Sequence, residues 1–293
     1  MSVDTAGYRR WAGRQLPNAL ACWPIARSGL VLVLRRKLFW LLIALAALHF
    51  LFIFATIYLK FQIAAQNPGL ERFVNQVLRS VTGTGETYRE FMFRQGTVTM
   101  LVLAFAGGML VGDDMRRGGL TFYLSRRIGR WHYVVGKLLA IGLLVSLTTT
   151  LPALVLYIEY GLLTNSFSYF RENLGILVGI LGYGLVMAVT LALLLFALAA
   201  WLHKTVPLVM AWACLFVLLP ALGELLQDVF DDRHWLLLSL WRDIRLVGTW
   251  FFGGIDTERE LAMLNPSLAI VLGVCIVSTL ALVPRVRAVR VVQ

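Results

Sequence analysis

The chain has few charged residues, few cysteines and none of the common catalytic motifs. Of its 293 residues, 15% are charged and 59% are hydrophobic, and the mean hydropathy is +0.77. This composition excludes an ordinary soluble domain and indicates a membrane protein. The three cysteines, Cys22, Cys214 and Cys275, are widely separated and form no CxxC pair. They therefore predict packing roles, not a disulfide framework or a metal site.

Motifs for catalysis and nucleotide binding are also missing. The chain contains no HExxH or GxSxG motif. Gly136 and Lys137 could end a phosphate-binding loop, but that motif needs glycine at 131 and Ser or Thr at 138. The chain has Trp131 and Leu138 at these positions. We therefore expect no catalytic residues, no cofactor and no metal in this chain, and hence no enzyme.

Long apolar runs dominate what the chain does contain. About 20 mainly apolar residues form a helix that crosses the hydrocarbon core of a bilayer, and six stretches free of Asp, Glu, Lys and Arg have roughly this length. They are Leu38–Leu59, Gly96–Gly112, Leu138–Ile158, Leu174–Leu202, Val206–Gly223 and Leu261–Val283. The prediction is an all-α polytopic membrane protein whose residues 1–293 form one transmembrane domain.

The distribution of basic residues predicts the orientation of this domain. One face collects residues 1–37, 113–137, the turn at His203 and Lys204, and the C-terminal tail. It holds seventeen of the 27 Lys and Arg residues but three of the 16 acidic ones. By the positive-inside rule this face is cytoplasmic. The prediction is therefore a protein of the cell (inner) membrane with both termini on the cytoplasmic side. The high net positive charge then mainly reflects the orientation of the chain, and the basic residues beside the spans also attract anionic lipid headgroups. We therefore do not predict nucleic-acid binding.

Three segments outside the spans have distinct compositions. Residues 1–37 form a cytoplasmic or interfacial segment. Its last part, from Trp23 to Lys37, predicts a helix on the cytoplasmic membrane surface, because apolar side chains alternate there with Arg27, Arg35 and Arg36. Residues 70–81 predict a second amphipathic helix on the outer side. Residues 224–260 predict an outer loop with short apolar pieces that are interfacial or partly re-entrant.

Several residues within the predicted spans are candidates for packing or function. Small residues four apart predict close helix packing at Gly108 and Gly112, and again at Gly175 and Gly179. His49 is more consistent with a packed neutral histidine than with a proton relay. Glu159 is expected at the outer interface.

The segment 113–137, "DDMRRGGLTFYLSRRIGRWHYVVGK", is far richer in arginine and rings than a simple connection requires. Arginine and aromatic residues are enriched at protein-binding surfaces. A basic loop that binds lipid headgroups explains the composition equally well, so composition alone leaves both interpretations open.

This segment resembles the cytoplasmic connection after the second span in permease subunits of type 2 ABC transporters, the export-type family. The matching positions are Asp113, Asp114, Gly118, Tyr123, Ser125, Arg126, Arg130, Tyr133, Gly136 and Lys137. The chain departs from the family pattern at Gly119, where Thr or Ala is usual, and at Arg127, where proline is usual. The six-span plan extends the resemblance to nearly the whole chain.

The resemblance implies a cytoplasmic coupling helix that docks a separate ABC ATPase subunit, in which ATP would be hydrolysed. The docking residues implied are Asp114, Tyr123, Ser125, Arg126, Arg130, Tyr133 and Lys137. It also implies a second permease copy or a paralogue in the assembly.

Two other functions fit a polytopic chain without catalytic motifs. An ATPase-independent carrier or channel would need polar groups within its spans, and the spans hold few. A membrane scaffold or sensor could keep the permease shape without transport. The transported substrate is not encoded in any motif of the sequence.

Overall fold

The computed structural model describes residues 21–66, 82–116, 129–164, 167–255 and 258–285, and within these ranges the chain is helical with no strand. The helices are α1 (Cys22–Leu34), α2 (Lys37–Gln66), α4 (Gly85–Gly107), η2 (Gly108–Gly112), α5 (Asp113–Arg116), α7 (Arg130–Thr148), α8 (Thr150–Leu163), α9 (Phe167–Glu172), α10 (Leu174–Leu202), α11 (Thr205–Ala213), η3 (Cys214–Leu218), α12 (Leu219–Phe230), η4 (Arg233–Leu238), α13 (Leu240–Phe251) and α14 (Glu258–Arg285).

Six of these helical stretches are long and apolar enough to cross a membrane, which confirms the predicted number of spans. They run over Lys37–Gln62, Gly85–Arg116, Arg130–Leu163, Leu174–Leu202, Thr205–Phe230 and Glu260–Arg285. The second begins at Gly85, where the sequence predicted Gly96. Its first turns carry charges, but Tyr88, Phe91 and Met92 alternate with them and are buried.

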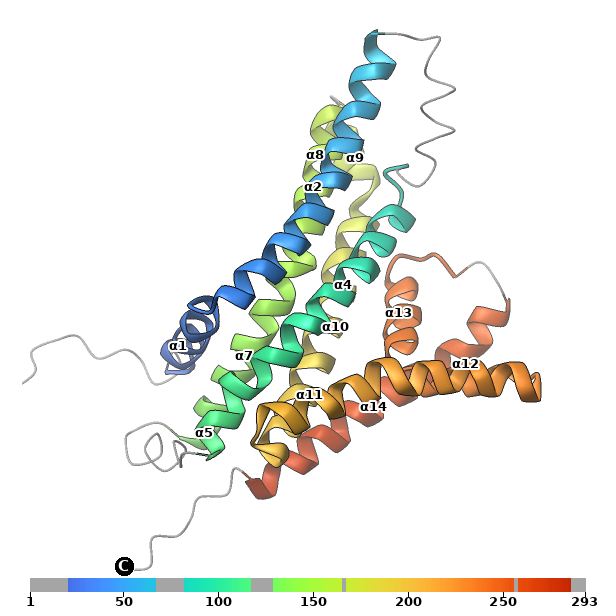
Figure 1. The fold of residues 1–293 in the computed structure, drawn as a ribbon. Coiled ribbons are helices and arrows are strands. Elements are labelled where there is room, and N and C mark those ends of the chain that lie inside the picture. The colour runs from blue at the N-terminus through green and yellow to red at the C-terminus, as the bar shows by residue number, and fades with distance from the viewer. Residues whose placement is uncertain (1–20, 67–81, 117–128, 165–166, 256–257, 286–293) are drawn as a thin grey trace, which may run out of the picture.

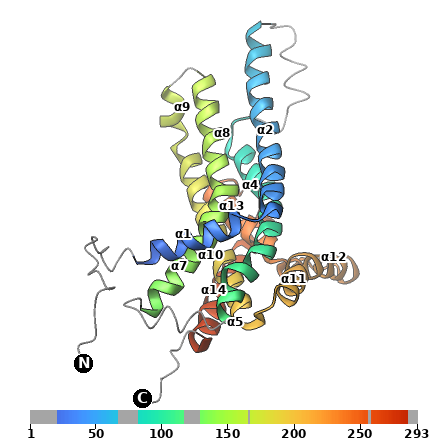
Figure 2. The same ribbon diagram turned by 60° about the vertical axis from the view of Figure 1, so that its left-hand side comes forward.

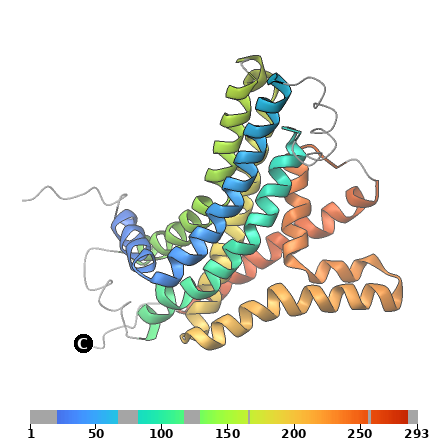
Figure 3. The ribbon, with the colours of Figure 1, turned by 45° about the horizontal axis from the view of Figure 1, so that its top comes forward.

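The helices form two diverging arms around α4 and α10 (Figures 1 and 3). The first arm contains α2, α7 and α8, whereas α11, α12 and α14 leave the bundle in another direction, with α13 packed against α10 and α14. In the apolar window of the α4 span 72% of residues are buried, against 17% in the spans of α2 and of α11–α12. The centre of the bundle is therefore α4 with α10, and the outer helices expose apolar side chains suited to lipid.

We call the end of the bundle with α1 and α5 the basal end, and the end with α8 and α9 the distal end. Helix α1 lies across the basal end (Figure 2) and packs mainly against α7. It occupies the region where the sequence predicted a surface helix. The second predicted amphipathic helix, residues 70–81, lies outside the described residues.

The third span is interrupted at Thr149, between α7 and α8. Pro152 has no backbone N–H, so it cannot complete the helical hydrogen bond to Thr148. In the turn before the break, the hydroxyls of Thr148 and Thr149 donate to the carbonyls of Leu144 and Val145. The break in the helix thus lies within the stretch that contains Thr148, Thr149, Thr150 and Pro152.

The segment 224–260 differs from a simple outer loop. The fifth span continues to Phe230, and η4 and α13 then fold back toward the bundle. Leu240, Ile244 and Val247 of α13 are buried, so this short helix is part of the packed structure.

Candidate functional site

Three of the predicted docking residues meet in a polar cluster at the basal end. The Nζ of Lys137 lies 2.6 Å from Oδ2 of Asp114, and the hydroxyl of Tyr133 donates to the same oxygen at 3.3 Å. The ammonium of Lys137 also lies 5.6 Å from the centre of the Tyr133 ring. Tyr133 and Lys137 are almost fully buried, and the Asp114 side chain is 24% exposed. The cluster therefore ties the end of the second span to the start of the third.

A local change in helix geometry provides one more partner for Lys137. Residues Gly108–Gly112 form a π-helical turn, η2, in which the N–H of Asp113 donates to the carbonyl of Gly108. Such a turn widens the helix and removes the regular partner of one carbonyl. The ammonium of Lys137 donates to the carbonyl of Leu110, within this turn. The π-turn and Lys137 thus stabilise each other.

Helix α1 packs on the same region through glycines. A Cβ atom on Gly136 would lie 2.8 Å from Cβ of Ile25 and 2.9 Å from the carbonyl oxygen of Cys22. On the α1 side, a Cβ atom on Gly29 would lie 3.0 Å from Cδ2 of Leu110 and 3.4 Å from Cβ of Ala140. Gly136 therefore allows the close approach of α1, and the next residue, Lys137, forms the ion pair with Asp114.

The remaining predicted docking residues are exposed or lie beyond the described residues. Arg130 is exposed at the first turn of α7, and the neighbouring Trp131 is 74% exposed. Tyr123, Ser125 and Arg126 lie outside the described ranges. The basal surface therefore presents Arg130 and Trp131, while Asp114, Tyr133 and Lys137 contact one another within the chain.

The four glycines predicted for packing have different environments. Gly108 and Gly112 lie against Thr205 and the carbonyl of His203, at the turn between α10 and α11. Gly179 of α10 lies against the ring of Phe252, which follows α13. Gly175 has no other atom of the chain within 4 Å of its Cβ position. The ridge on α10 thus holds Phe252 at Gly179, and no packing partner is found for Gly175 in the described chain.

The environments of His49 and Glu159, the two ionisable residues singled out in the predicted spans, are seen in the structure. The Nδ1 of His49 lies 2.7 Å from Oε1 of Gln95, and its ring stacks on Phe91. This agrees with a packed histidine. The expectation for Glu159 is wrong: its side chain is buried with 8% exposure, and both carboxylate oxygens lack a hydrogen-bond partner. Glu159 faces the helix bundle because its neighbours on α8, including Leu156, pack inward.

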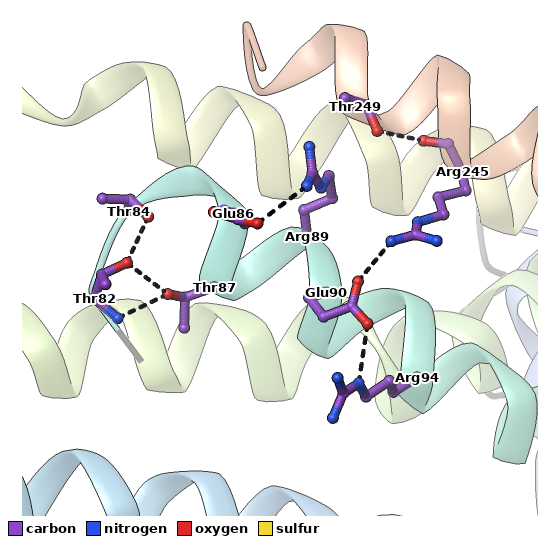
Figure 4. Close-up of polar contacts among 9 residues, drawn as sticks. All are labelled: Thr82, Thr84, Glu86, Thr87, Arg89, Glu90, Arg94, Arg245 and Thr249. Carbon is purple, nitrogen blue, oxygen red and sulfur yellow. Dashed lines mark hydrogen bonds and ion pairs between the residues drawn. The ribbon is translucent and has the colours of Figure 1, made fainter. Parts of the chain in front are cut away.

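A second polar region, which the sequence did not predict, lies in the distal half of the molecule. Glu90 of α4 accepts from Arg94 of its own helix at 3.0 Å and from Arg245 of α13 at 2.8 Å (Figure 4). The guanidinium of Arg245 also lies 4.3 Å from the centre of the Phe93 ring. Arg89 lies 3.7 Å from Glu86. These contacts fix α13 against the N-terminal turns of α4.

A cavity of about 480 Å³ opens beside this network, between α4, α12, η4, α13 and α14. Asp243 lines it and is 1% exposed. Its Oδ1 accepts a hydrogen bond from Ser267 at 2.8 Å, and its Oδ2 has no partner. Burial raises the pKa of Asp243 to about 7, although the Ser267 hydroxyl and Arg242 oppose this shift. Asp243 therefore carries much less negative charge at neutral pH than an exposed aspartate.

The sequence contains a weak signal for this region. Helix α13 carries Arg242, Asp243 and Arg245 among apolar residues, and α4 begins with alternating charged and aromatic residues. Such amphipathic patterns point to polar surfaces within the structure. The convergence of these helices, which are far apart in the sequence, on one cavity depends on their packing.

In the described ranges, no group of three His, Cys, Asp or Glu side chains could hold a metal ion. No model of a known protein family matches the chain, and no curated protein matches its sequence. The geometry and the sequence pattern are therefore the basis for a functional proposal.

Proposed function

We propose that this chain is the membrane-spanning subunit of an ATP-driven ABC exporter and that residues 113–137 dock a separate ATPase subunit. The observation that supports this most is the Asp114–Lys137 ion pair, in which the lysine is buried and the aspartate is partly exposed. It joins α5, which ends just before residues 117–128, to α7, which begins just after them. A partner that moves this segment would therefore move the second and third spans together.

The surroundings of the ion pair suit such a mechanical role. Helix α1 is packed on α7 through Gly136, and η2 is bonded to Lys137. The exposed Arg130 and Trp131 are side chains of the kind that anchor protein interfaces. Nucleotide binding can shift the permease between inward and outward states only if the ATPase binds those states with different affinity. A rigid contact at the basal end would transmit a movement of the bound ATPase to the second and third spans, and so link ATPase binding to the state of the permease.

The proposed assembly contains two permeases and two ATPases in a cell membrane, with the basal end in the cytoplasm. The low burial of the spans of α2, α11–α12 and α14 leaves apolar surface for lipid and for a second copy or paralogue. The proposed export direction follows the family resemblance. We expect the chain to form the translocation pathway and to hold no ATPase site.

Docking can be tested by co-expressing the chain with a P-loop ATPase encoded beside it and measuring co-purification and ATP hydrolysis. We expect Arg126→Glu or Tyr123→Ala to reduce recovery of the ATPase or to uncouple its activity from transport. Arg171→Glu is a matched control, because Arg171 is exposed at the distal end. Unchanged recovery and full transport in both docking variants would contradict the proposal, and ATP hydrolysis without transport would favour a sensor or scaffold.

The orientation has a separate test. A Ser125→Cys variant, made after Cys22, Cys214 and Cys275 are replaced by serine, should resist a membrane-impermeant thiol reagent in intact cells. It should react once the membrane is permeabilised. Labelling in intact cells would place the segment outside and exclude docking to a cytoplasmic ATPase.

A further inference from the structure

The distal cavity has the size and the lining of a ligand site. Its volume of about 480 Å³ lies in the range of pockets that hold small organic ligands. Its walls come from α4, α12, η4, α13 and α14. The start of α4, at the centre of the bundle, and the arm that contains α12 and α14 therefore contribute to one cavity.

Arginine side chains dominate the polar part of this lining. Arg89, Arg233, Arg242 and Arg245 all line the cavity. Arg245 is held by Glu90, and the buried Nε of Arg89 has no hydrogen-bond acceptor. Neither Arg233 nor Arg242 forms an ion pair within the described parts of the chain. At least two guanidinium groups are thus free to receive an acceptor.

The acidic residues of the lining do not balance these cations one for one. Glu224, Asp243 and Glu260 are the carboxylates in the cavity wall. Glu224 and Glu260 are exposed, as are Arg233 and Arg242, so water screens exposed charges of both signs. Four arginines nevertheless face three carboxylates in the lining. Asp243 is buried and bonded to Ser267. The cavity is therefore better suited to an anion than to a cation.

The other walls are apolar and aromatic. Phe93, Phe216, Leu236, Trp241, Leu246 and Met263 line them. The ring of Trp241 is stacked on Phe93 at 5.3 Å and sits over Gly96, where a Cβ atom would lie 2.2 Å from it. A rigid aromatic wall beside free guanidinium groups matches a ligand with an apolar body and a charged head.

We propose that this cavity binds an anionic amphiphile, with its phosphate or carboxylate head on Arg242 and Arg89 and its apolar body against Trp241 and Phe216. Guanidinium groups bind such oxyanions through paired hydrogen bonds. Arg242 is the exposed entry contact, and the buried Nε of Arg89 gains the acceptor that it lacks in the chain. The inference adds a ligand class to the proposed exporter, and its test needs no ATPase, so either proposal can fail while the other stands.

Binding is tested on the full chain in nanodiscs of phosphatidylcholine, with dodecyl phosphate as the probe and empty nanodiscs as the blank. We expect saturable binding to the wild-type chain. Dodecyl maltoside, which has the same tail and no charge, should bind at least tenfold more weakly. Arg242→Gln should weaken dodecyl phosphate binding about tenfold, the usual effect of losing one charged hydrogen bond, and Arg242→Glu should weaken it further.

The control variant is Arg171→Gln, an exposed arginine of α9 that does not line the cavity. It should bind like the wild type, and equal melting temperatures should show that all variants are folded. Unchanged affinity in Arg242→Glu, or equal affinity for the maltoside, would overturn the proposal. Nanodiscs with added phosphatidylglycerol distinguish two sources of the ligand. Competition supports a membrane lipid, and retained binding without competition supports an amphiphile from solution.

Discussion

The basal cluster and the distal cavity differ in how many of their charged groups are paired within the chain. In the basal cluster, the buried Lys137 and the partly exposed Asp114 neutralise each other, and Tyr133 donates a hydrogen bond to Asp114. In the distal cavity, Arg233 and Arg242 have no ion-pair partner in the described chain, and Asp243 keeps one oxygen unpartnered. Charges that satisfy each other hold a structure together, whereas unsatisfied charges beside a cavity can accept a ligand.

This difference matches the roles that we propose for the two ends. A coupling element must transmit force without deforming, and a closed network of contacts provides that rigidity. A binding site must keep groups available, which costs stability when the groups are buried. The basal cluster is therefore expected to dominate stability, and the distal cavity to dominate ligand binding.

The largest effect should come from breaking the basal ion pair. Asp114→Leu leaves the buried ammonium of Lys137 without a counter-ion, which should lower the free energy of unfolding by about 3–5 kcal/mol. The double variant Asp114→Leu/Lys137→Met should recover much of this loss, because no unpaired charge remains. Thermal unfolding in detergent measures both.

Lys204→Met serves as the control for this pair, since Lys204 is exposed at the turn between α10 and α11. It should change the melting temperature little. If Asp114→Leu is as stable as the wild type, the ion pair does not hold the second and third spans together. That result would contradict the proposal that the two spans move together through this contact.

A smaller effect, specific to pH, should come from Asp243. Because its pKa is about 7 in the folded chain and near 3.8 when exposed, the folded state holds the proton more tightly. The resulting stability is fully present below about pH 4 and is lost as the pH rises through about 7. At about 1.4 kcal/mol for each pH unit, the total is at most roughly 4 kcal/mol.

Asp243→Asn keeps an acceptor for Ser267 and cannot ionise, so it isolates this contribution. Other carboxylates titrate in both proteins and cancel in the comparison. We expect the variant and the wild type to melt together near pH 4 and the variant to be the more stable at pH 8. Parallel melting curves across this range would show that Asp243 ionises as freely in the folded chain as in water.

The two ends also differ in how much of them the sequence predicts. The spans were predicted because hydropathy is a property of contiguous residues, and an apolar run of the right length has few other outcomes. Residues 113–137 stand out by their composition and by their family resemblance. That Asp114, Tyr133 and Lys137 contact each other could not be predicted, since the contact depends on how the two flanking helices meet.

The distal cavity escaped prediction for a related reason. Its arginines are spread over α4, η4 and α13, and each alone is typical of a polar surface beside the membrane. The sequence predicts the start of the second span eleven residues too late, because its charged first turns lower the hydropathy, although Tyr88 and Gln95 there are buried. Hydropathy reports the average of a segment and does not show which side chains face its neighbours.

The smallest expected effect concerns two glycines of α10, which the sequence treats as equivalent. Gly179→Ala brings a Cβ atom to 2.5 Å from the Phe252 ring, and this overpacking should cost about 1–3 kcal/mol as the ring shifts. Gly175→Ala meets open space, so the higher helix propensity of alanine should leave stability unchanged or raise it by up to about 1 kcal/mol. Melting temperatures of the two variants test this. A loss in Gly175→Ala equal to that in Gly179→Ala would mean that Gly175 packs against a second copy of the chain, and measuring its oligomeric state would then show whether that interface forms.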